Sequence, residues 1–407
     1  MSGPERLECD ALVVGAGPAG AIAAARLARE GLDVLVLEKG HLPRHKICGD
    51  FVTPGSVRLL REAGLVDSEL AARAVPLRGM RLLLDATRVP LPFPAGEIGW
   101  SLGRRDLDLG LARAARRAGA RLLEGVRVDS LEECGGRVVA RAGGAGTGPL
   151  VIGAGVAVDA GGRHAITPAR RGWGRTSRWP VRHAVAAWFE GVTDLGDAGE
   201  MHVLAGGALG YVGVSPIGPG IAGAAAVVSP RVFRAGARDP ADLLRHLIDS
   251  SDELRRRFAG ARRITGVRGA GPLARGASRY GAGRLLIAGD AAAFVDPFTG
   301  EGIHAALVSG TMAAGAAARI HRDPGDAPRA IRAYERGLRS ALRPRHALQR
   351  ALQSVLASPA VARRVASALA RREDLAAALI AVTSGCRDPW GLLDPGFMRP
   401  LVIETLR

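Results

Sequence analysis

The chain has 407 residues, which is enough for two or three domains of roughly 150 residues each. Hydrophobic residues make up 47% of it, so the chain can bury a large core and intrinsic disorder is excluded as its main state. The formal net charge is +17, and it comes almost entirely from scattered arginine, because Lys39 and Lys46 are the only lysines. We interpret this charge as compositional bias rather than as a nucleic-acid-binding surface.

The cysteines argue against a disulfide framework and against a metal site. Cys9, Cys48, Cys134 and Cys386 lie far apart and form no Cys-x-x-Cys pair, which is typical of a reducing cytoplasm. The first ten residues do not resemble a signal peptide, and no stretch of about 20 strongly apolar residues predicts a transmembrane helix. We predict a cytoplasmic protein, with membrane association as an alternative.

Residues 10–38 have the pattern of a complete strand–helix–strand unit. Short apolar strands are predicted at Asp10–Val14 and Asp33–Leu37, with an Ala-rich helix at Ala21–Glu30 between them. The first strand runs into a Gly-x-Gly-x-x-Gly sequence, and the second ends at Glu38. This context makes the glycine run a dinucleotide-binding fingerprint, because it places a helix N-terminus at a pyrophosphate and an acid at a ribose.

Further along the chain, helices and strands alternate. We predict, in order, an amphipathic helix at Ser56–Ala72, a strand pair at Arg78–Pro94, a helix at Arg104–Ala118, strands at Arg121–Val139 and Leu150–Asp159, strands from Val181 to Val228, a charged helix at Arg238–Phe258, a strand at Arg284–Ala288 and a helix from Glu301. After Asp326 the chain is predicted to be mostly helical to Ala381, divided at Pro344 and Pro359.

A second glycine run, Gly153-Ala154-Gly155, does not predict another nucleotide site. It is followed by the strand Val156–Val158 rather than by a helix, so no separate NAD(P) domain is expected.

Three later motifs favour FAD over NAD. Asp159-Ala160-Gly161-Gly162 and Gly289-Asp290 each end a predicted strand, where a carboxylate can accept a hydrogen bond from a ribityl hydroxyl. The run from Asp296 to Ile303 (DPFTGEGI) opens a helix, and its free N–H groups suit the flavin edge on which negative charge gathers upon reduction.

These motifs together resemble the FAD-dependent oxidoreductases of the p-hydroxybenzoate hydroxylase-like superfamily, and most closely its geranylgeranyl-reductase-like branch. The resembling stretches are DALVVGAGPAGAIAAARLAREGLDVLVLEKG, PRHKICGDFVTPGSVRLL, GRRDLDLGLARAARRAGA, VAVDAGGRH and RLLIAGDAAAFVDPFTGEGIHAAL. The expected fold is α/β, with a discontinuous Rossmann-type FAD-binding domain (1–75, 101–170 and 273–325), an inserted β-sheet substrate domain (76–100 and 171–272) and a C-terminal helical region (326–407).

The resemblance implies roles for individual residues. Gly15, Gly17 and Gly20, with Pro18 and Ala19 between them, would bind the FAD pyrophosphate. The acidic and basic residues expected at the cofactor are Glu38 with its neighbour Lys39, Arg104 of the Arg-x-x-Leu-Asp pattern, Asp159 with Gly161, and Asp290 after Gly289. The residues expected near the isoalloxazine are Pro297, Gly300, Glu301, Gly302, Ile303 and, from the Lys-x-Cys-Gly element, Lys46, Cys48 and Gly49.

Two of these segments also contain candidate catalytic residues, three in all. Cys48 could contact substrate or flavin, or it could be a small buried hydrophobe. Lys46 could orient the ring or pair with a substrate acid, or it could be solvated. His304 could protonate a flavin or substrate atom, or it could simply be packed.

The substrate region departs from the resembling branch. Its reductases and halogenases have a tryptophan signature on the substrate sheet, whereas the run Tyr211–Pro216 contains no tryptophan. The strand-end motif is Asp-Ala-Gly rather than the commoner Ala-Asp-Gly. The aromatic residues Trp173, Trp179, Trp188 and Phe189 could line an apolar substrate pocket or pack in the core.

The C-terminal region allows a further alternative. The Arg-rich helices at Arg343–Arg372 could lie on an anionic membrane with Leu348, Leu352, Val355 and Leu356 inserted, or these apolar residues could pack on the core.

The resemblance implies that NAD(P)H reduces the FAD. We favour a monooxygenase that hydroxylates or epoxidises, through a flavin C4a-hydroperoxide, a small hydrophobic aromatic, polyketide, quinone-precursor or isoprenoid substrate. The first alternative is a geranylgeranyl-reductase-like enzyme that saturates alkene bonds. The alternative from another class is a basic peripheral membrane or nucleic-acid-binding protein with an inactive flavin fold.

Overall fold

The computed structural model describes residues 4–177, 179–207, 209–235, 239–393 and 395–406. Its first sheet has a parallel core with the strand order β21 (Leu285–Ile287), β11 (Gly148–Asp159), β1 (Glu5–Val14), β2 (Val34–Glu38) and β8 (Arg121–Glu124). The strands are short apolar runs because both faces of the sheet are covered: residues 11–14 of β1 are all buried.

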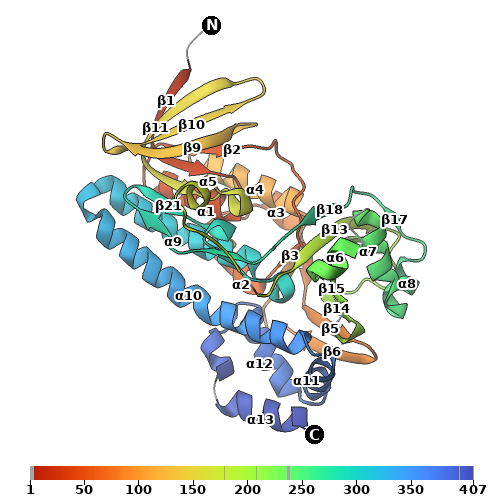
Figure 1. Cartoon of the computed structure of the whole chain (residues 1–407). Coiled ribbons are helices and arrows are strands. Elements are labelled where there is room, and N and C mark those ends of the chain that lie inside the picture. The colour runs from red at the N-terminus through yellow and green to blue at the C-terminus, as the bar shows by residue number, and fades with distance from the viewer. Residues whose placement is uncertain (1–3, 178, 208, 236–238, 394, 407) are drawn as a thin grey trace.

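Helices cover one face of this sheet and an antiparallel hairpin covers the other. The helices are α1 (Pro18–Arg29), α4 (Arg104–Arg117) and α9 (Gly302–Arg322), and the hairpin is β9 (Arg127–Cys134) with β10 (Arg137–Gly144), as Figure 1 shows in the upper part of the molecule. The carboxyl ends of β1, β2, β11 and β21 meet at one edge, which is where open α/β sheets bind ligands. The predicted α/β fold class is confirmed.

The second sheet is mostly antiparallel. Its order is β17 (Arg262–Arg263), β13 (His183–Glu190), β16 (Ile221–Val228), β15 (Gly210–Gly218), β14 (Ala198–Leu204), β5 (Gly79–Leu84) and β6 (Thr87–Pro92), with β18 (Arg268–Ala270) also pairing with β13. Helices α7 (Pro240–Asp249) and α8 (Asp252–Phe258) pack on one face through a core of aliphatic and phenylalanine side chains. We call this the substrate sheet.

Four helices follow the two sheets: α10 (Ala327–Leu356), α11 (Pro359–Arg371), α12 (Glu373–Thr383) and α13 (Pro395–Leu406). The long helix α10 packs on α9 and runs diagonally across the molecule to the end of the substrate sheet where α11 and α12 contact β6 (Figure 1). No helix in the described part of the chain is both long enough and apolar enough to cross a membrane.

Smaller elements complete the fold. They are the strands β3 (Phe51–Val52), β4 (Val75–Leu77), β7 (Gly99–Ser101), β12 (Gly174–Thr176), β19 (Arg275–Ala277), β20 (Gly281–Ala282) and β22 (Ala293–Phe294), the helices α2 (Pro54–Glu62), α3 (Ser68–Arg73), α5 (Ile166–Arg170) and α6 (Pro230–Ala235), and the 3-10 turns η1 (Gly162–His164), η2 (Ala205–Gly207), η3 (Gly289–Ala291), η4 (Pro297–Thr299), η5 (Pro324–Asp326) and η6 (Pro389–Leu393).

Two predicted helices are each divided in the structure. The helix predicted at Ser56–Ala72 is α2 and α3, because Gly64 takes a left-handed φ of 58° between them and Asp67 caps a new helix. The helix predicted at Arg238–Phe258 is α7 and α8, separated by Ser250 and the N-cap Ser251. Arg238 lies outside the described residues.

Pro344 was predicted to break or kink the C-terminal helices, but α10 continues through it. A proline inside a helix removes one backbone hydrogen bond and costs about 3 kcal/mol or more. Helix α10 offsets this cost by packing on both sides of Pro344, through buried residues such as Leu338 upstream and Leu356 downstream. The prediction for Pro359 is confirmed, because Pro359 begins α11 after a break at Ser358.

Candidate active site

The glycine loop after β1 folds as its spacing predicts. Gly15 has a φ of 93°, and a Cβ there would lie 2.7 Å from the carbonyl oxygen of Ala160. A Cβ at Gly20 would lie 1.9 Å from the carbonyl oxygen of Gly15. Helix α1 begins at Pro18 and has no side-chain cap at Gly17, so its first N–H groups are left to bind an anion. Ala19, in the first turn of α1, is buried.

Glu38 ends β2 beside this loop and is only 3% exposed. Its carboxylate accepts hydrogen bonds from the N–H groups of Ala16 at 2.9 Å and Gly40 at 3.0 Å, and it pairs with Arg44 at 3.1 Å. Burial by itself would raise the pKa of Glu38, but Arg44 and the two N–H groups outweigh it and lower the pKa. Glu38 is therefore ionised at pH 7 and held rigidly where a ribose would lie.

Arg104 lies next to the glycine loop, since a Cβ at Gly17 would come within 3.8 Å of its Nη2. Its Nε and Nη2 donate to the two carboxylate oxygens of Asp108, at 2.8 and 2.9 Å. Asp108 is fully buried and also accepts from Arg44 at 2.9 Å. Arg44 and Asp108 were missed by the sequence analysis, although Asp108 follows Arg104 by one helical turn and completes the Arg-x-x-Leu-Asp pattern.

The loop containing Lys46, Cys48 and Gly49 also reaches this edge of the sheet. Lys46 Nζ lies 3.6 Å from the position of a Cβ at Gly162, and burial followed by the charge of Arg104 lowers the Lys46 pKa. Burial raises the pKa of Cys48, so its sulfur is a thiol at pH 7 and not a nucleophilic thiolate. The carbonyl of Gly49 accepts a hydrogen bond from Ser215 of the substrate sheet at 2.8 Å.

Asp50 follows these residues and was not predicted as a site residue. It has a left-handed φ of 54° and is 3% exposed. Burial raises its pKa to about 6, although hydrogen bonds from Trp188 and from the N–H of Arg104 oppose this shift. An acid with a raised pKa between two domains is a typical feature of functional sites.

The two strand-end acids differ in what they contact. Both carboxylate oxygens of Asp159 bind its own loop, by accepting from the N–H groups of Gly161 at 3.0 Å and Thr167 at 2.7 Å. Asp159 therefore supports the loop that contains Gly161. Its contact with the cofactor stays a prediction. Asp290, after Gly289, is half-buried and makes no hydrogen bond among the described residues. Its charge acts on Lys46, Arg104 and Arg275.

The turn 296–301 connects the first sheet to α9. Asp296 accepts from the N–H of Phe298 at 2.9 Å, and Pro297 begins the turn. Gly300 has a φ of 70°, and a Cβ there would lie 2.3 Å from Phe51, so only glycine fits. Helix α9 begins at Gly302 and Ile303 with no side-chain cap, which leaves N–H groups available at the predicted flavin edge.

Two predicted residues at this turn do not face an open site. Glu301 is 2% exposed, and its carboxylate binds Arg345, Thr299 and Gln349 inside the protein. His304 is 8% exposed, and burial followed by the charge of Arg345 lowers its pKa to about 3. The imidazole is therefore neutral at pH 7, so His304 does not provide the cationic acid that the sequence analysis considered.

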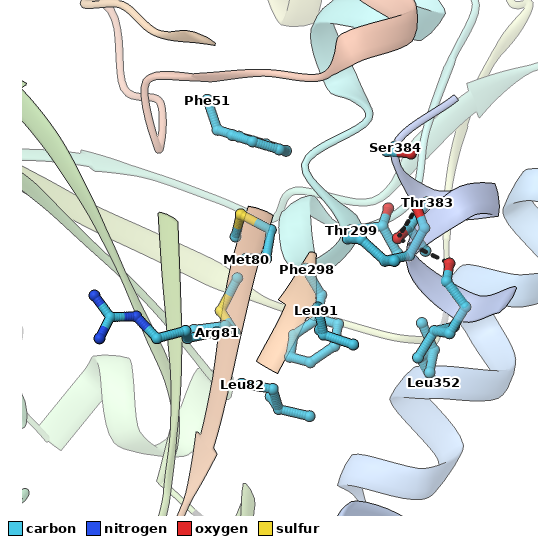
Figure 2. Close-up of a pocket in the computed structure, with 13 residues that line it drawn as sticks. Phe51, Met80, Arg81, Leu82, Leu91, Phe298, Thr299, Leu352, Thr383 and Ser384 are labelled. Atoms are coloured by element: carbon cyan, nitrogen blue, oxygen red, sulfur yellow. Dashed lines mark hydrogen bonds between the residues drawn. The ribbon is translucent and has the colours of Figure 1, made fainter. Parts of the chain in front are cut away.

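An apolar cavity lies between the turn 296–301, the substrate sheet and helices α10 and α12. It contains about 550 Å³ of empty space including its open mouth. Figure 2 shows Phe51 and Met80 on one side of it and Leu352 and Thr383 on the other. Its lining residues are Phe51, Met80, Arg81, Leu82, Leu91, Met201, Phe298, Thr299, Leu352, Leu379, Ile380, Thr383 and Ser384.

Arg81 lines this cavity only through the part of the residue near its backbone, and its guanidinium lies outside. Its side chain points away from the other lining residues in Figure 2, and its Nη2 pairs with Glu200 at 3.0 Å. Residues 80 and 82 face the cavity because side chains alternate along β5.

The aromatic residues predicted to line the pocket do not line this cavity. Trp173 and Phe189 pack in the two hydrophobic cores, Trp179 is 46% exposed and Trp188 binds Asp50. Three of the four C-terminal residues considered for membrane contact are engaged within the protein: Leu352 lines the cavity, and Val355 and Leu356 pack beneath the substrate sheet. The fourth, Leu348, is half-buried. Among the described residues, no three His, Cys, Asp or Glu side chains gather as metal ligands.

The residues at the sheet edge fit FAD. The open N-terminus of α1 and the cations Arg104 and Lys46 suit a diphosphate, and the ionised Glu38 suits a ribose. The carboxylate of Asp290, which has no side-chain hydrogen bond among the described residues, suits a polyhydroxyl chain, and the uncapped start of α9 suits the flavin edge. Fold and site together define a flavoprotein of the dinucleotide-binding α/β class.

The comparison with protein families agrees with this geometry. The family described as "FAD binding domain" matches residues 8–327. The chain belongs to this family and is an FAD-dependent oxidoreductase, which confirms the resemblance on which the sequence analysis relied.

Individual relatives carry several activities. Menaquinone reductase of Mycobacterium tuberculosis is 33% identical over 324 residues, which cover 75% of each chain. A flavin-dependent halogenase of Armillaria mellea is 29% identical over 352 residues, covering 76% of this chain and 67% of the relative.

Two solved structures share the fold over almost the whole chain. A flavoprotein/dehydrogenase from Cytophaga hutchinsonii has a TM-score of 0.84 at 21% identity, with 98% of each chain covered. A geranylgeranyl bacteriochlorophyll reductase-like protein from Thermoplasma acidophilum has a TM-score of 0.80 at 20% identity, with 98% of this chain and 99% of that chain covered. At these identities the similarity shows the fold alone.

Proposed function

We propose that the protein is an FAD-dependent reductase that saturates a carbon–carbon double bond in an isoprenoid-type lipid. The observation that carries this proposal is the apolar cavity, because Phe298 and Thr299 of the turn before α9 form part of its wall. A substrate held there would lie beside the predicted flavin edge. The similarity to menaquinone reductase at 33% identity supports a reductase that acts on a prenylated lipid.

The hydroxyl groups in the cavity favour a hydrocarbon ligand. Thr299 Oγ1 donates to Glu301 at 2.9 Å, Thr383 Oγ1 to the carbonyl of Leu379 at 3.1 Å and Ser384 Oγ to the carbonyl of Ala381 at 3.2 Å. Each hydroxyl proton is therefore already committed within the protein, so the cavity has none to donate to a substrate oxygen. A carbonyl oxygen placed here would lose its hydrogen bonds to water without replacement by these hydroxyls, whereas an alkene would lose none.

Bound FAD would supply the two-electron reduction, and the residues of the chain would position and shield the reactants. The side chains of Phe51, Met80 and Leu352 give the cavity an apolar wall, which would shield a bound substrate from water. Glu38 and Arg104 would hold the adenosine and diphosphate ends, and the N–H groups at the start of α9 would face the ring. Lys46, which lies near Asp290 and Arg104, would balance the negative charge of the diphosphate.

NAD(P)H is part of the proposal as the electron donor. The glycine run at Gly153–Gly155 lies in the middle of β11, as its sequence predicted, and is not a second dinucleotide site. NAD(P)H would therefore react at the same flavin edge that the substrate uses.

The decisive experiment measures product mass. The FAD-loaded protein is incubated without oxygen with NADPH or NADH and menaquinone or a geranylgeranyl lipid in detergent. The lipid is then reoxidised in air, which returns any quinol to the quinone but leaves a saturated bond unchanged. A remaining gain of two hydrogens per double bond supports the proposal. An unchanged lipid mass with both donors, under conditions where the flavin is reduced, contradicts it.

Monooxygenation is the second candidate. The run Tyr211–Pro216 on β15 supports it, because it lacks the tryptophan signature of the reductases. The same incubation under labelled oxygen separates the two reactions, since a monooxygenase adds one labelled oxygen atom and a reductase adds none. Purified protein without any bound flavin would contradict both candidates and favour an inactive flavin fold.

A further inference from the structure

Helix α10 contacts the turn 296–301 through three polar side chains spaced four residues apart. Arg345 pairs with Glu301, Gln349 donates to Thr299 at 3.1 Å and to Glu301 at 3.3 Å, and Gln353 donates to Asp296 at 2.8 Å. A spacing of four places these residues on one face of the helix. The C-terminal region thus holds both carboxylates that flank the turn.

The Arg345–Glu301 pair is nearly buried, with side-chain exposures of 12% and 2%. Glu301 immediately precedes α9, whose N-terminal N–H groups face the predicted flavin edge. A helix N-terminus has about half a positive charge, which a neighbouring carboxylate would offset. Arg345 neutralises that carboxylate, so the positive end of α9 remains available to the cofactor.

Loss of either partner would leave one uncompensated charge near the cofactor. Interactions between charges are strong in such a poorly solvated place, and salt screens them little. Burial raises the pKa of Glu301 above its usual range, and the positive charge of Arg345 opposes this shift.

We propose that the Arg345–Glu301 pair sets the reduction potential of the bound FAD, by balancing the charge at the start of α9. This role goes beyond the proposed function, because it applies to whichever substrate accepts the electrons. Arg345 and Glu301 are positioning residues in this proposal. They act through the N–H groups of α9 and do not contact the substrate.

The pair makes opposite predictions for its two members. Without Arg345, an unpaired carboxylate opposes the negative charge of the reduced cofactor and lowers the midpoint potential. Without Glu301, an unpaired guanidinium favours that charge and raises the potential. When both are replaced by neutral residues, the two effects cancel.

The test is an equilibrium redox titration of the FAD-loaded protein at about pH 8 and again at about pH 9, because burial raises the pKa of Glu301 above the ordinary glutamate range and the predicted shifts require its ionised form. We expect Arg345→Met to lower the potential by about 30 mV or more, which corresponds to tenfold for a two-electron couple, and Glu301→Gln to raise it by a similar amount. The double variant should return close to the wild-type value, and Arg345→Lys should stay close to it. Arg336→Met, at an exposed position of the same helix, is the control and should change nothing.

The two single variants would shift the reduction potential in opposite directions if charge balance is lost, but not if the local structure is lost. If both single variants shift the potential in the same direction, or if neither shifts it, the proposal is wrong. If Arg345→Met does not retain FAD, then Glu301→Gln decides the question, because only charge balance predicts a higher potential for it.

Discussion

Asp50 and Trp188 join the two domains through a hydrogen bond of 2.7 Å from the indole Nε1 to Oδ2 of the carboxyl group. The other carboxylate oxygen, Oδ1, accepts from the backbone N–H of Arg104 at 3.2 Å, at the start of α4. Asp50 thus connects the loop of Lys46 and Cys48 to both β13 of the substrate sheet and the helix of Arg104. A shift of the substrate sheet would be transmitted directly to this loop.

The raised pKa of Asp50 predicts how stability depends on pH. Its pKa is about 6 in the folded protein, whereas the ordinary value is 3.8, so the folded state holds a proton that the unfolded state loses first. The contribution of Asp50 to stability therefore falls as pH rises through the window between these two values, by roughly 3 kcal/mol in total, and is constant above it. Because other carboxyl groups titrate in the same range, the test is the difference between two proteins: the free energy of unfolding in urea should fall more with pH in the wild type than in Asp50→Asn.

An exposed acid provides the control for this prediction. Asp85→Asn should keep the wild-type slope, because Asp85 is exposed. Trp188→Phe should lower stability by about 1–3 kcal/mol, since it leaves Asp50 Oδ2 buried without a donor. Equal slopes in the wild type and Asp50→Asn would show that Asp50 does not titrate in this window.

Replacing Glu38 should weaken FAD binding. Glu38→Gln removes a charge-assisted hydrogen bond worth about 1.5–3 kcal/mol, so we expect FAD affinity to fall roughly tenfold to a hundredfold. Titration of the apoprotein with FAD, followed by flavin fluorescence, measures this change. Glu8→Gln, at an exposed position of β1, should bind FAD like the wild type. Unchanged affinity of Glu38→Gln would place the adenosine ribose elsewhere.

Two glycines of α9 should respond to alanine in opposite ways. A Cβ at Gly310 would lie 2.3 Å from the carbonyl oxygen of Ala19 in α1, so Gly310→Ala should destabilise the protein by about 1–3 kcal/mol or more. A Cβ at Gly315 meets nothing within 4 Å, so Gly315→Ala should stabilise it by about 0.5–1 kcal/mol through helix propensity. Urea unfolding measures the free energy of unfolding of both variants. Equal changes in the two would contradict the close packing of α1 on α9.

Filling the cavity should reduce turnover of a long apolar substrate without loss of FAD. Leu352→Trp places an indole in the cavity, so we expect kcat/KM to fall about tenfold or more, the equivalent of 1.4 kcal/mol of transition-state binding. The absorbance spectrum of the bound flavin should stay the same. Val361→Trp, where the native side chain is 40% exposed on α11, should have wild-type kinetics. Normal kinetics in Leu352→Trp would mean that the substrate binds elsewhere.

Where one continuous segment of the chain forms a part of the site, that part could be predicted from the sequence. The loop Gly15–Gly20, Glu38 at the end of β2 and Gly300 at the turn before α9 depend on backbone conformations that glycine or a strand end specifies locally. Asp50 was missed because its partner Trp188 lies in a distant segment, and Arg44 because its contact with Asp108 joins two segments. Asp108 was missed although its partner Arg104 lies one turn away in the same helix. Of the two alternatives for the aromatic residues 173, 179, 188 and 189, lining a pocket does not hold for this cavity, which methionine, leucine and phenylalanine side chains line.

The amino-acid pattern alone predicts the dinucleotide-binding α/β fold and the edge of the sheet where FAD is expected. The reason is that short apolar strands, a glycine-constrained turn and an uncapped helix are local features, and parallel strands necessarily bring their carboxyl ends together. The surroundings of that edge follow only from long-range packing: the salt bridge of Arg345 to Glu301, the hydrogen bond of Trp188 to Asp50 and the cavity wall formed by α10 and α12. These contacts join residues more than 40 positions apart, and no periodicity in the chain specifies them.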